Sequence, residues 1–138
     1  PEPALQETVF NRQLHIAERC GKPVILHCVK RFDALPAAIE RFPRIPAWIV
    51  HGFRRGPVLA AQLVANGFHL SFGAALLDPT PKLLEAFRQT PLDKIFLETD
   101  EADIDIRELH ASGAGLKDMA TDAFITHINQ NAQRIFKP

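Results

Sequence analysis

The sequence predicts an α/β fold made of parallel β/α units, in the class of the TIM-type (β/α) barrel. Short apolar runs alternate along the chain with stretches of helical periodicity, as they do when helices connect parallel strands. No glycine-rich phosphate-binding turn follows the first apolar run, and polar residues end at least three of the runs. These features favour a barrel over an open doubly wound sheet, because the strand ends of a barrel meet at one mouth.

The first half of the chain holds a leading helix and two apolar runs. Residues 4–19 place apolar side chains at helical spacing, and Gly21 follows as a C-cap. Residues 23–28 form an apolar run without alternation, which is typical of a strand buried on both faces. Residues 32–42 are helical again, and a proline-rich break separates them from a second apolar strand at 47–51.

The second half repeats the alternation of helix and strand. We expect a helix at 58–65, a strand at 68–72, a helix over about 79–88 and a strand at 94–100. A last helical region covers about 115–136, in one or two pieces. The chain therefore holds four strands in four parallel units.

Composition indicates a globular domain. Of the 138 residues, 46% are hydrophobic and 23% are charged, which excludes wholesale disorder. Sixteen basic residues balance sixteen acidic ones, which argues against a protein that coats nucleic acid nonspecifically. The longest apolar run is far shorter than a membrane span of about 18 residues, so we expect a soluble cytoplasmic protein. Cys20 and Cys28 are interpreted as packed thiols.

Three strands end in residues that commonly bind metals. His27, His51 and Asp100 each close an apolar run and precede a loop. In a parallel barrel the three side chains would point to a common centre, and imidazole and carboxylate are usual ligands of zinc and other divalent metals. A single histidine at a strand end is more often a surface or hydrogen-bonded residue, but three residues at equivalent positions favour a metal site. Cys28 should face away from that site, and His69 is interpreted as structural.

Charge is unevenly distributed along the chain. Between residues 22 and 57 seven basic residues accompany two acidic ones, a net charge of +5. Between residues 93 and 108 seven acidic residues accompany two basic ones, a net charge of −5. Lys30, Arg54 and Arg55 follow the two strand-end histidines and are candidates for binding phosphate oxygens beside the metal. The alternative is that Arg54 and Arg55 are only solvated.

Several sequence blocks together carry a resemblance to a known family. They are Lys22-Pro-Val-Ile-Leu-His27, Ile49-Val-His51-Gly-Phe53, Gly67-Phe-His-Leu-Ser71 with Gly73, Phe96-Leu-Glu-Thr-Asp100, and Asn131 with Ile135-Phe136. In this order and spacing the chain resembles the TatD family of metal-dependent hydrolases, and most of all a short-chain branch of it.

The resemblance implies an enzyme that hydrolyses phosphodiester bonds, typically in DNA from an end, with two divalent metals (Mg, Mn or Zn) at the barrel mouth. His27 and His51 match ligands of one metal, and Asp100 matches a ligand of the other. Asp100 could also accept a proton from the attacking water, which would make it the catalytic residue. Glu98 lies two residues earlier on the same face of the strand, and we expect it to be a buried partner that orients the metal ligands.

The chain lacks two features that the resemblance leads one to look for. It contains no His-x-His pair and no earlier glutamate that would bridge the metals. A complete barrel takes about 200–250 residues. We therefore expect residues 1–138 to be the C-terminal portion of a single barrel domain, holding the last four of eight units and inactive without the missing N-terminal half.

Two other functions are compatible with these residues. The same metal-binding mouth could hydrolyse a small-molecule ester or amide, because one fold serves many substrates. The chain could also be a non-catalytic half-barrel with an incomplete site. DNA as the substrate predicts binding that weakens steeply with salt, whereas the half-barrel predicts that the chain alone binds no metal.

Overall fold

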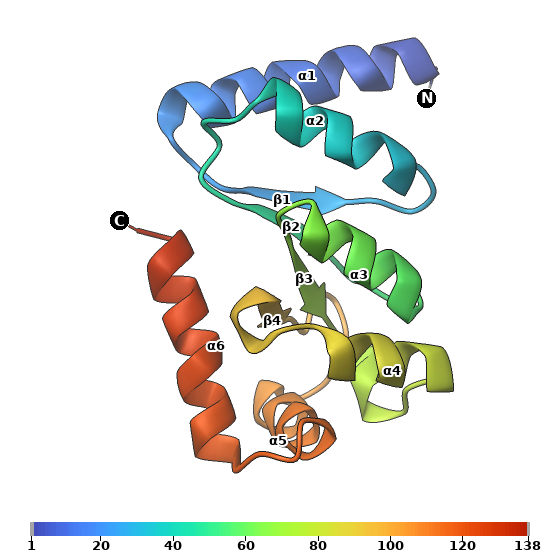
Figure 1. Ribbon diagram of the computed structural model, residues 1–138, viewed down its shortest axis with the longest axis vertical. Coiled ribbons are helices and arrows are strands. Elements are labelled where there is room, and N and C mark those ends of the chain that lie inside the picture. The colour runs from blue at the N-terminus through green and yellow to red at the C-terminus, as the bar shows by residue number, and fades with distance from the viewer. Residues whose placement is uncertain (1, 138) are drawn as a thin grey trace.

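The computed structural model describes residues 2–137, which contain a four-stranded parallel sheet surrounded by helices (Figure 1). The strands lie in sequence order: β1 (Val24–His27), β2 (Trp48–His51), β3 (Phe68–Phe72) and β4 (Ile95–Leu97). The helices are α1 (Pro3–Cys20), α2 (Leu35–Arg41), α3 (Pro57–Ala65), α4 (Pro81–Gln89), α5 (Ile106–Leu116) and α6 (Thr121–Ile135). Short 3₁₀ turns cover Phe32–Ala34, Ala74–Leu77 and Leu92–Lys94. The predicted parallel α/β architecture is confirmed.

Local sequence signals set several of the element boundaries. Gly21 ends α1 in the left-handed conformation (φ 61°), and its backbone N–H donates to carbonyls of the last turn. Prolines stand in the first turn of α2, α3 and α4, where a missing N–H costs no hydrogen bond. Thr80 caps α4 by accepting a hydrogen bond from the backbone N–H of Leu83 at 3.3 Å.

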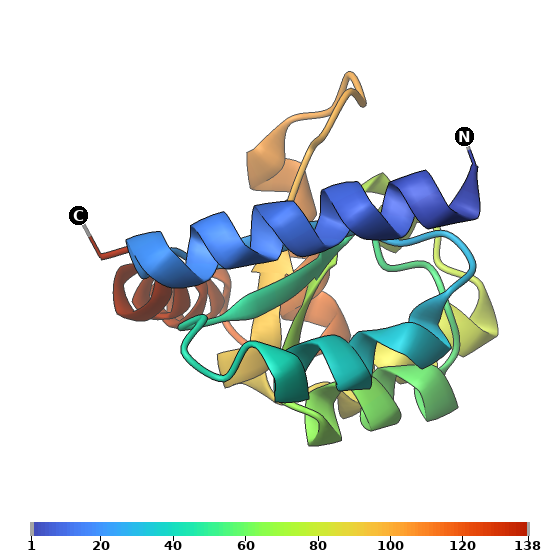
Figure 2. The same ribbon diagram turned by 90° about the horizontal axis from the view of Figure 1, so that it is seen from above.

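One predicted strand end is wrong, and one helix was missed. The fourth strand was expected to run to residue 100, but it ends at Leu97 because a turn closed by the Ala102 N–H and the Thr99 carbonyl takes the chain out of the ladder. Helix α5 was missed, since Gly113 and Gly115 lower its intrinsic helix propensity. The loop between β4 and α5 projects from the rest of the molecule (Figure 2).

The hydrophobic core lies between one face of the sheet and the helices. Alternate strand residues, such as Val50 on β2 and Leu70 on β3, belong to it. Buried aromatic rings carry the packing outward: the rings of Phe72 and Phe87 meet edge to face at 5.0 Å between centroids, and Phe87 lies 6.4 Å from Phe124 on α6. This core fixes the strands and therefore the position of the loops at their ends.

The opposite face of the sheet is less well covered. A cavity of about 310 Å³ lies against it and is lined by Ile25, Ile49, Ser71 and Phe96, among others. Ile25 on the edge strand β1 is 62% exposed, so the expectation that this strand is buried on both faces is wrong. An edge strand has a neighbour on one side only, and an apolar run in the sequence does not reveal that position.

No helix within residues 2–137 is both long enough and apolar enough to cross a membrane.

Candidate metal and substrate site

The strand-end histidines are brought together by the register of the sheet. In the parallel ladder between β1 and β2, His27 pairs with His51, and their ring centroids lie 5.3 Å apart. His27 is exposed on the edge strand, whereas His51 is partly buried. The expected convergence of these two side chains at the carboxyl ends of the strands is therefore present.

His51 is held by a carboxylate from the neighbourhood of β4. Its Nδ1 lies 2.7 Å from Oε1 of Glu98, and the other oxygen of Glu98 accepts a hydrogen bond of 2.5 Å from the buried Ser71 hydroxyl. A carboxylate only accepts hydrogen bonds, so the N–H at Nδ1 of His51 is the donor of this contact. This chain of contacts fixes the orientation of the His51 ring.

Two glycines lie beside Glu98. A Cβ on Gly73 would lie 3.5 Å from Cγ of Glu98, and a Cβ on Gly52 would lie 3.6 Å from its Oε1. Gly52 also has φ 62°, a conformation that side chains other than glycine rarely adopt. The backbone just after β2 and just after β3 therefore passes close to this side chain.

Asp100 completes a group with the donor atoms of a metal site. His51, Glu98 and Asp100 each place one possible ligand atom within 4.8 Å of the others. Asp100 is exposed and adopts φ 49°, and it lies three residues beyond the end of β4 instead of closing the strand as expected. Imidazole and carboxylate are donor types that suit a divalent first-row cation or magnesium. Both oxygens of Glu98 are engaged by His51 and Ser71, so the group fits such an ion through His51 and Asp100. His27 lies beside this group without belonging to it.

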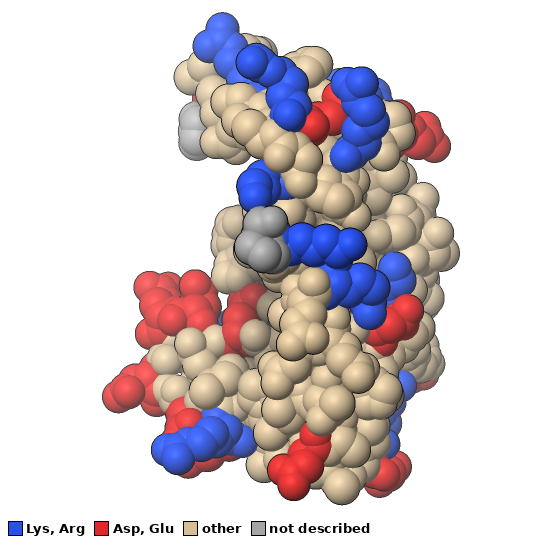
Figure 3. Space-filling model, turned by 90° about the vertical axis from the view of Figure 1, so that its left-hand side faces the viewer, with Lys and Arg blue, Asp and Glu red and all other residues tan. Residues whose placement is uncertain are grey.

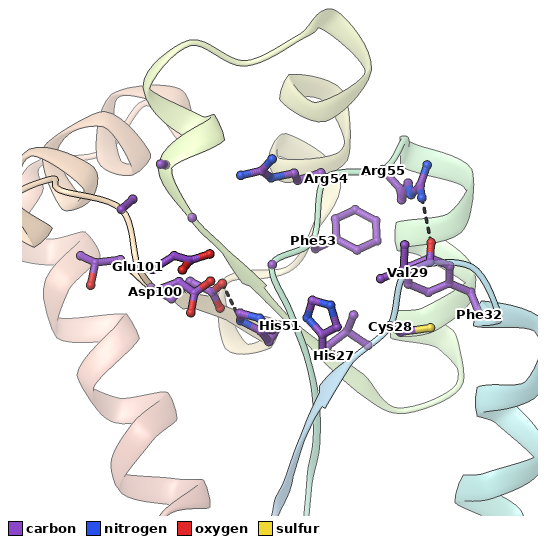
Figure 4. Close-up of a pocket in the computed structure, with 17 residues that line it drawn as sticks. His27, Cys28, Val29, Phe32, His51, Phe53, Arg54, Arg55, Asp100 and Glu101 are labelled. Atoms are coloured by element: carbon purple, nitrogen blue, oxygen red, sulfur yellow. Dashed lines mark hydrogen bonds and ion pairs between the residues drawn. The ribbon is translucent and has the colours of Figure 1, made fainter. Parts of the chain in front are cut away.

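The group opens into a cavity of about 520 Å³ at the carboxyl ends of the strands (Figure 4). Its walls come from the loops after β1, β2, β3 and β4. The lining residues with functional groups are His27, Cys28, His51, Arg54, Arg55, Glu98, Thr99, Asp100 and Glu101. A cavity of this size with a few convergent polar groups is typical of a small-ligand or substrate site.

The three basic candidates differ in position. Arg54 and Arg55 line the cavity, and their side chains point in different directions (Figure 4). Arg55 donates from Nη2 to the carbonyl of Val29 at 2.8 Å, and its guanidinium lies 5.9 Å from the centre of the Phe32 ring. Lys30 is exposed and does not line the cavity. On one face of the molecule, most basic side chains lie in the upper part and acidic ones are most numerous in the lower part, with some of the opposite charge in each (Figure 3).

Two residues at the site were missed or placed wrongly from the sequence. Cys28 was expected to face away, but it lines the cavity because the strand ends at His27 and the alternation of faces stops there. Burial raises the pKa of its thiol. Ser71 was not assigned a role, although the period of two along β3 puts it on the sheet face opposite the core, where it reaches Glu98.

Known proteins resemble this chain over nearly its whole length. The family model described as "TatD related DNase" matches residues 1–137. The chain belongs to the TatD family. It is 30% identical over 98 residues to an uncharacterized metal-dependent hydrolase of Haemophilus influenzae, covering 70% of this chain and 37% of that protein. It is also 30% identical over 115 residues to the deoxyribonuclease Tat-D of Schizosaccharomyces pombe, covering 82% and 36% of the two chains.

Solved TatD structures share the fold of this chain. A TatD-family hydrolase from Entamoeba histolytica superposes with a TM-score of 0.84 at 14% identity, covering 99% of this chain and 58% of that one. The TatD homologue YjjV from Escherichia coli K12 gives a TM-score of 0.82 at 22% identity, covering 96% and 56%. The barrel class expected from the sequence is confirmed. The chain spans 36–37% of the length of the two relatives named above.

Proposed function

We propose that this chain contributes to a metal-dependent phosphodiesterase that removes nucleotides from an end of DNA. The observation that carries the proposal is the grouping of His51, Glu98 and Asp100 within 4.8 Å, at the bottom of a cavity that two arginines also line. Metal ligands and cations in one cavity suit a substrate with phosphate oxygens. The family supports the same conclusion, since a relative in Erwinia billingiae, 30% identical over 102 residues, is named a 3'-5' ssDNA/RNA exonuclease.

We assign His27, His51 and Asp100 as metal ligands and expect two divalent ions, Mg, Mn or Zn. A divalent ion at such a site lowers the pKa of a bound water and polarises a phosphoryl oxygen. Asp100, the exposed carboxylate of the group, accepts the proton of the attacking water. Glu98 orients the His51 ring from its Nδ1 side, because its two oxygens are engaged by His51 and Ser71.

The basic residues attract the substrate in this proposal. Arg54 and Arg55 line the cavity and supply positive charge opposite the acidic group. Lys30 is exposed on the loop that follows His27, where it can meet a phosphate further along a strand of DNA. Such contacts steer a polyanion to the site and become weaker as salt screens them.

We also propose that these residues form the C-terminal portion of one barrel domain. Ile25 on the edge strand β1 is 62% exposed, and Val29 in the loop after this strand is 53% exposed. An exposed apolar edge strand is a surface that further β/α units would cover. In that arrangement the N-terminal half supplies the remaining metal ligands, and the chain alone has little activity.

Metal binding followed by DNA cleavage tests the proposal. Calorimetric titration with Mn²⁺ should show binding to the chain, and Asp100→Asn should weaken it about tenfold or more, because a charged ligand is lost. Asp103→Asn is the matched control, since Asp103 is an exposed acidic residue of the same loop that does not line the cavity. Equal affinity of the Asp100 variant and the wild type would contradict the assignment.

The substrate class needs a separate measurement. A protein containing these residues within a complete barrel should shorten end-labelled single-stranded DNA when Mg²⁺ or Mn²⁺ is present, and His51→Ala should abolish the reaction. If the substrate is a small ester or amide, the rate should hardly depend on salt. If it is DNA, binding should fall steeply between about 50 and 200 mM salt.

A further inference from the structure

The two neighbouring arginines of the cavity have different surroundings. Arg55 is engaged by the loop after β1, through its hydrogen bond of 2.8 Å to the Val29 carbonyl and its position 5.9 Å from the centre of the Phe32 ring. Arg54 has no such contact among residues 2–137, and its side chain points over the cavity in the direction of the acidic group (Figure 4). The two consecutive arginines therefore differ in their contacts: Arg55 is bound to a neighbouring loop, whereas Arg54, among these residues, is not.

The loop that Arg55 contacts has few hydrogen bonds to the rest of the molecule, although Cys28 and Phe32 of this loop pack against the hydrophobic core. β1 is an edge strand of four residues in which only Leu26 is buried. Within residues 2–137, the hydrogen bond from Arg55 is the one that joins residues 28–33 to another segment of the chain, the loop after β2. This loop directly follows His27, so its position affects where the His27 ring lies.

The loop that carries Arg55 is firmly anchored. The backbone N–H of Phe53 donates to the Ser71 carbonyl at 2.9 Å, and its ring is 2% exposed and packs edge to face on Phe72 at 5.7 Å. Arg55 stands two residues further along. Its side chain therefore connects the anchored loop after His51 to a loop after His27 that has few hydrogen bonds of its own to other segments.

We propose that Arg55 is a positioning residue that fixes the His27 loop, and that Arg54 alone of the two makes direct contact with a substrate phosphate. The geometry gives each role a reason. Arg55 combines a carbonyl hydrogen bond with a stacked position over an aromatic ring, both of which hold a guanidinium in place. Arg54 keeps its donors free for a bidentate contact with phosphate oxygens. The second half of this proposal rests on the proposed DNA substrate, whereas the first half does not.

Nuclear magnetic relaxation of the chain tests the positioning role without any substrate. In Arg55→Ala, the backbone ¹⁵N order parameters of residues 28–33 should fall from values typical of ordered backbone towards those of flexible loops, below about 0.6. Arg54→Ala is the matched control and should leave them unchanged. Arg55→Lys keeps the charge but not the planar guanidinium, and it should also lower them. Unchanged order parameters in Arg55→Ala would overturn the positioning role.

Binding of a single-stranded DNA oligonucleotide tests the division between the two residues. The slope of log affinity against log salt should shrink by about 0.7 in Arg54→Ala, the amount for one phosphate contact on a single strand. The slope should stay the same in Arg55→Ala and in the charge control Arg19→Ala, at the end of α1. An equal loss of slope in both cavity variants would overturn the assignment. Absence of binding by the wild type would contradict the DNA substrate, and the relaxation result would still decide the role of Arg55.

Discussion

At the scale of single residues, small changes decide whether neighbouring groups fit. Gly113 on α5 is an example, because a Cβ at this position would lie 2.9 Å from Cε1 of the fully buried Phe124. Neither the ring nor the helix backbone has room to move in a packed core. The glycine thus lets α5 and α6 approach each other.

Substitution of this glycine should be costly. We expect Gly113→Ala to lower the free energy of unfolding by about 1–3 kcal/mol through overpacking. Gly115→Ala is the control on the same helix, because a Cβ there meets nothing within 4 Å, and it should be neutral or stabilising. Urea denaturation of the two variants provides the comparison, and similar stabilities would contradict the close approach.

A second residue links stability to pH. His69 is 7% exposed on β3, its Nδ1 lies 3.3 Å from the Trp48 carbonyl, and burial lowers its pKa to about 4. The folded state therefore prefers neutral His69, while the unfolded chain takes up the proton near pH 6.5. The stability that this difference provides is complete above about pH 6.5 and is lost as the pH falls towards 4.

Replacement of His69 should remove this pH dependence. Between pH 6.5 and 4 the wild type should lose up to about 3 kcal/mol through this group, more than a His69→Gln variant loses over the same range. Thermal or urea unfolding at several pH values measures the difference. Parallel curves for the two proteins would show that His69 is not kept neutral by the fold.

At the scale of elements, one buried side chain attaches α6 to the start of β4. Asn131 is 2% exposed, and its Nδ2 donates to the carbonyls of Leu92 at 2.7 Å and Ile95 at 2.9 Å. Its Oδ1 accepts from Arg134 at 3.0 Å. All the polar atoms of the side chain are used, so the helix is fixed in register against the strand.

An isosteric change at Asn131 should break this attachment. Asn131→Asp removes both donors and places a carboxylate against two carbonyl oxygens, so we expect a loss of about 2–4 kcal/mol in unfolding free energy. Asn129→Asp makes the same chemical change at an exposed position of α6 and should cost little. A comparably small effect at both positions would mean that the Asn131 hydrogen bonds contribute nothing to stability.

Element types were predictable from the sequence where the pattern was local. The apolar runs at β1, β2 and β3 and the helical spacing of α1 required no knowledge of the rest of the fold. Helix α5 was not predictable in this way, because Gly113 is favoured by contact with Phe124 and not by helix propensity. The end of β4 was equally hidden, since a turn and the positive φ of Asp100 determine it.

The candidate site follows the same division. The rule that parallel strands end at one edge was enough to bring His27, His51 and Asp100 into one region. The contacts of Ser71 and the commitment of Arg55 to Val29 depend on side-chain geometry across separate units. No spacing along the chain encodes such contacts, so they had to come from the structure.

At the scale of the whole molecule, exposed apolar side chains occur on α1 and on the edge strand β1, which follow each other along the chain. Leu5 and Ile16 on α1 are 58% and 59% exposed, and Ile25 on β1 is 62% exposed. Val58 is also exposed, at 71%. It lies at the N-terminal end of α3, a helix that packs on β3 and not on the edge strand β1. A strand edge with apolar neighbours is a site for association, whereas a single exposed apolar residue is ordinary.

The isolated chain should therefore self-associate through the β1 edge. We expect its sedimentation coefficient to rise with protein concentration, and Ile25→Lys to reduce that rise, because a charged side chain at an edge strand resists pairing with another chain. Val58→Lys is the control, with the same chemical change at a more exposed residue, and it should leave the concentration dependence as it is. Sedimentation velocity over a wide concentration range measures all three proteins. If the wild type stays monomeric throughout, or if both lysine variants act alike, the chain does not associate through the edge of β1.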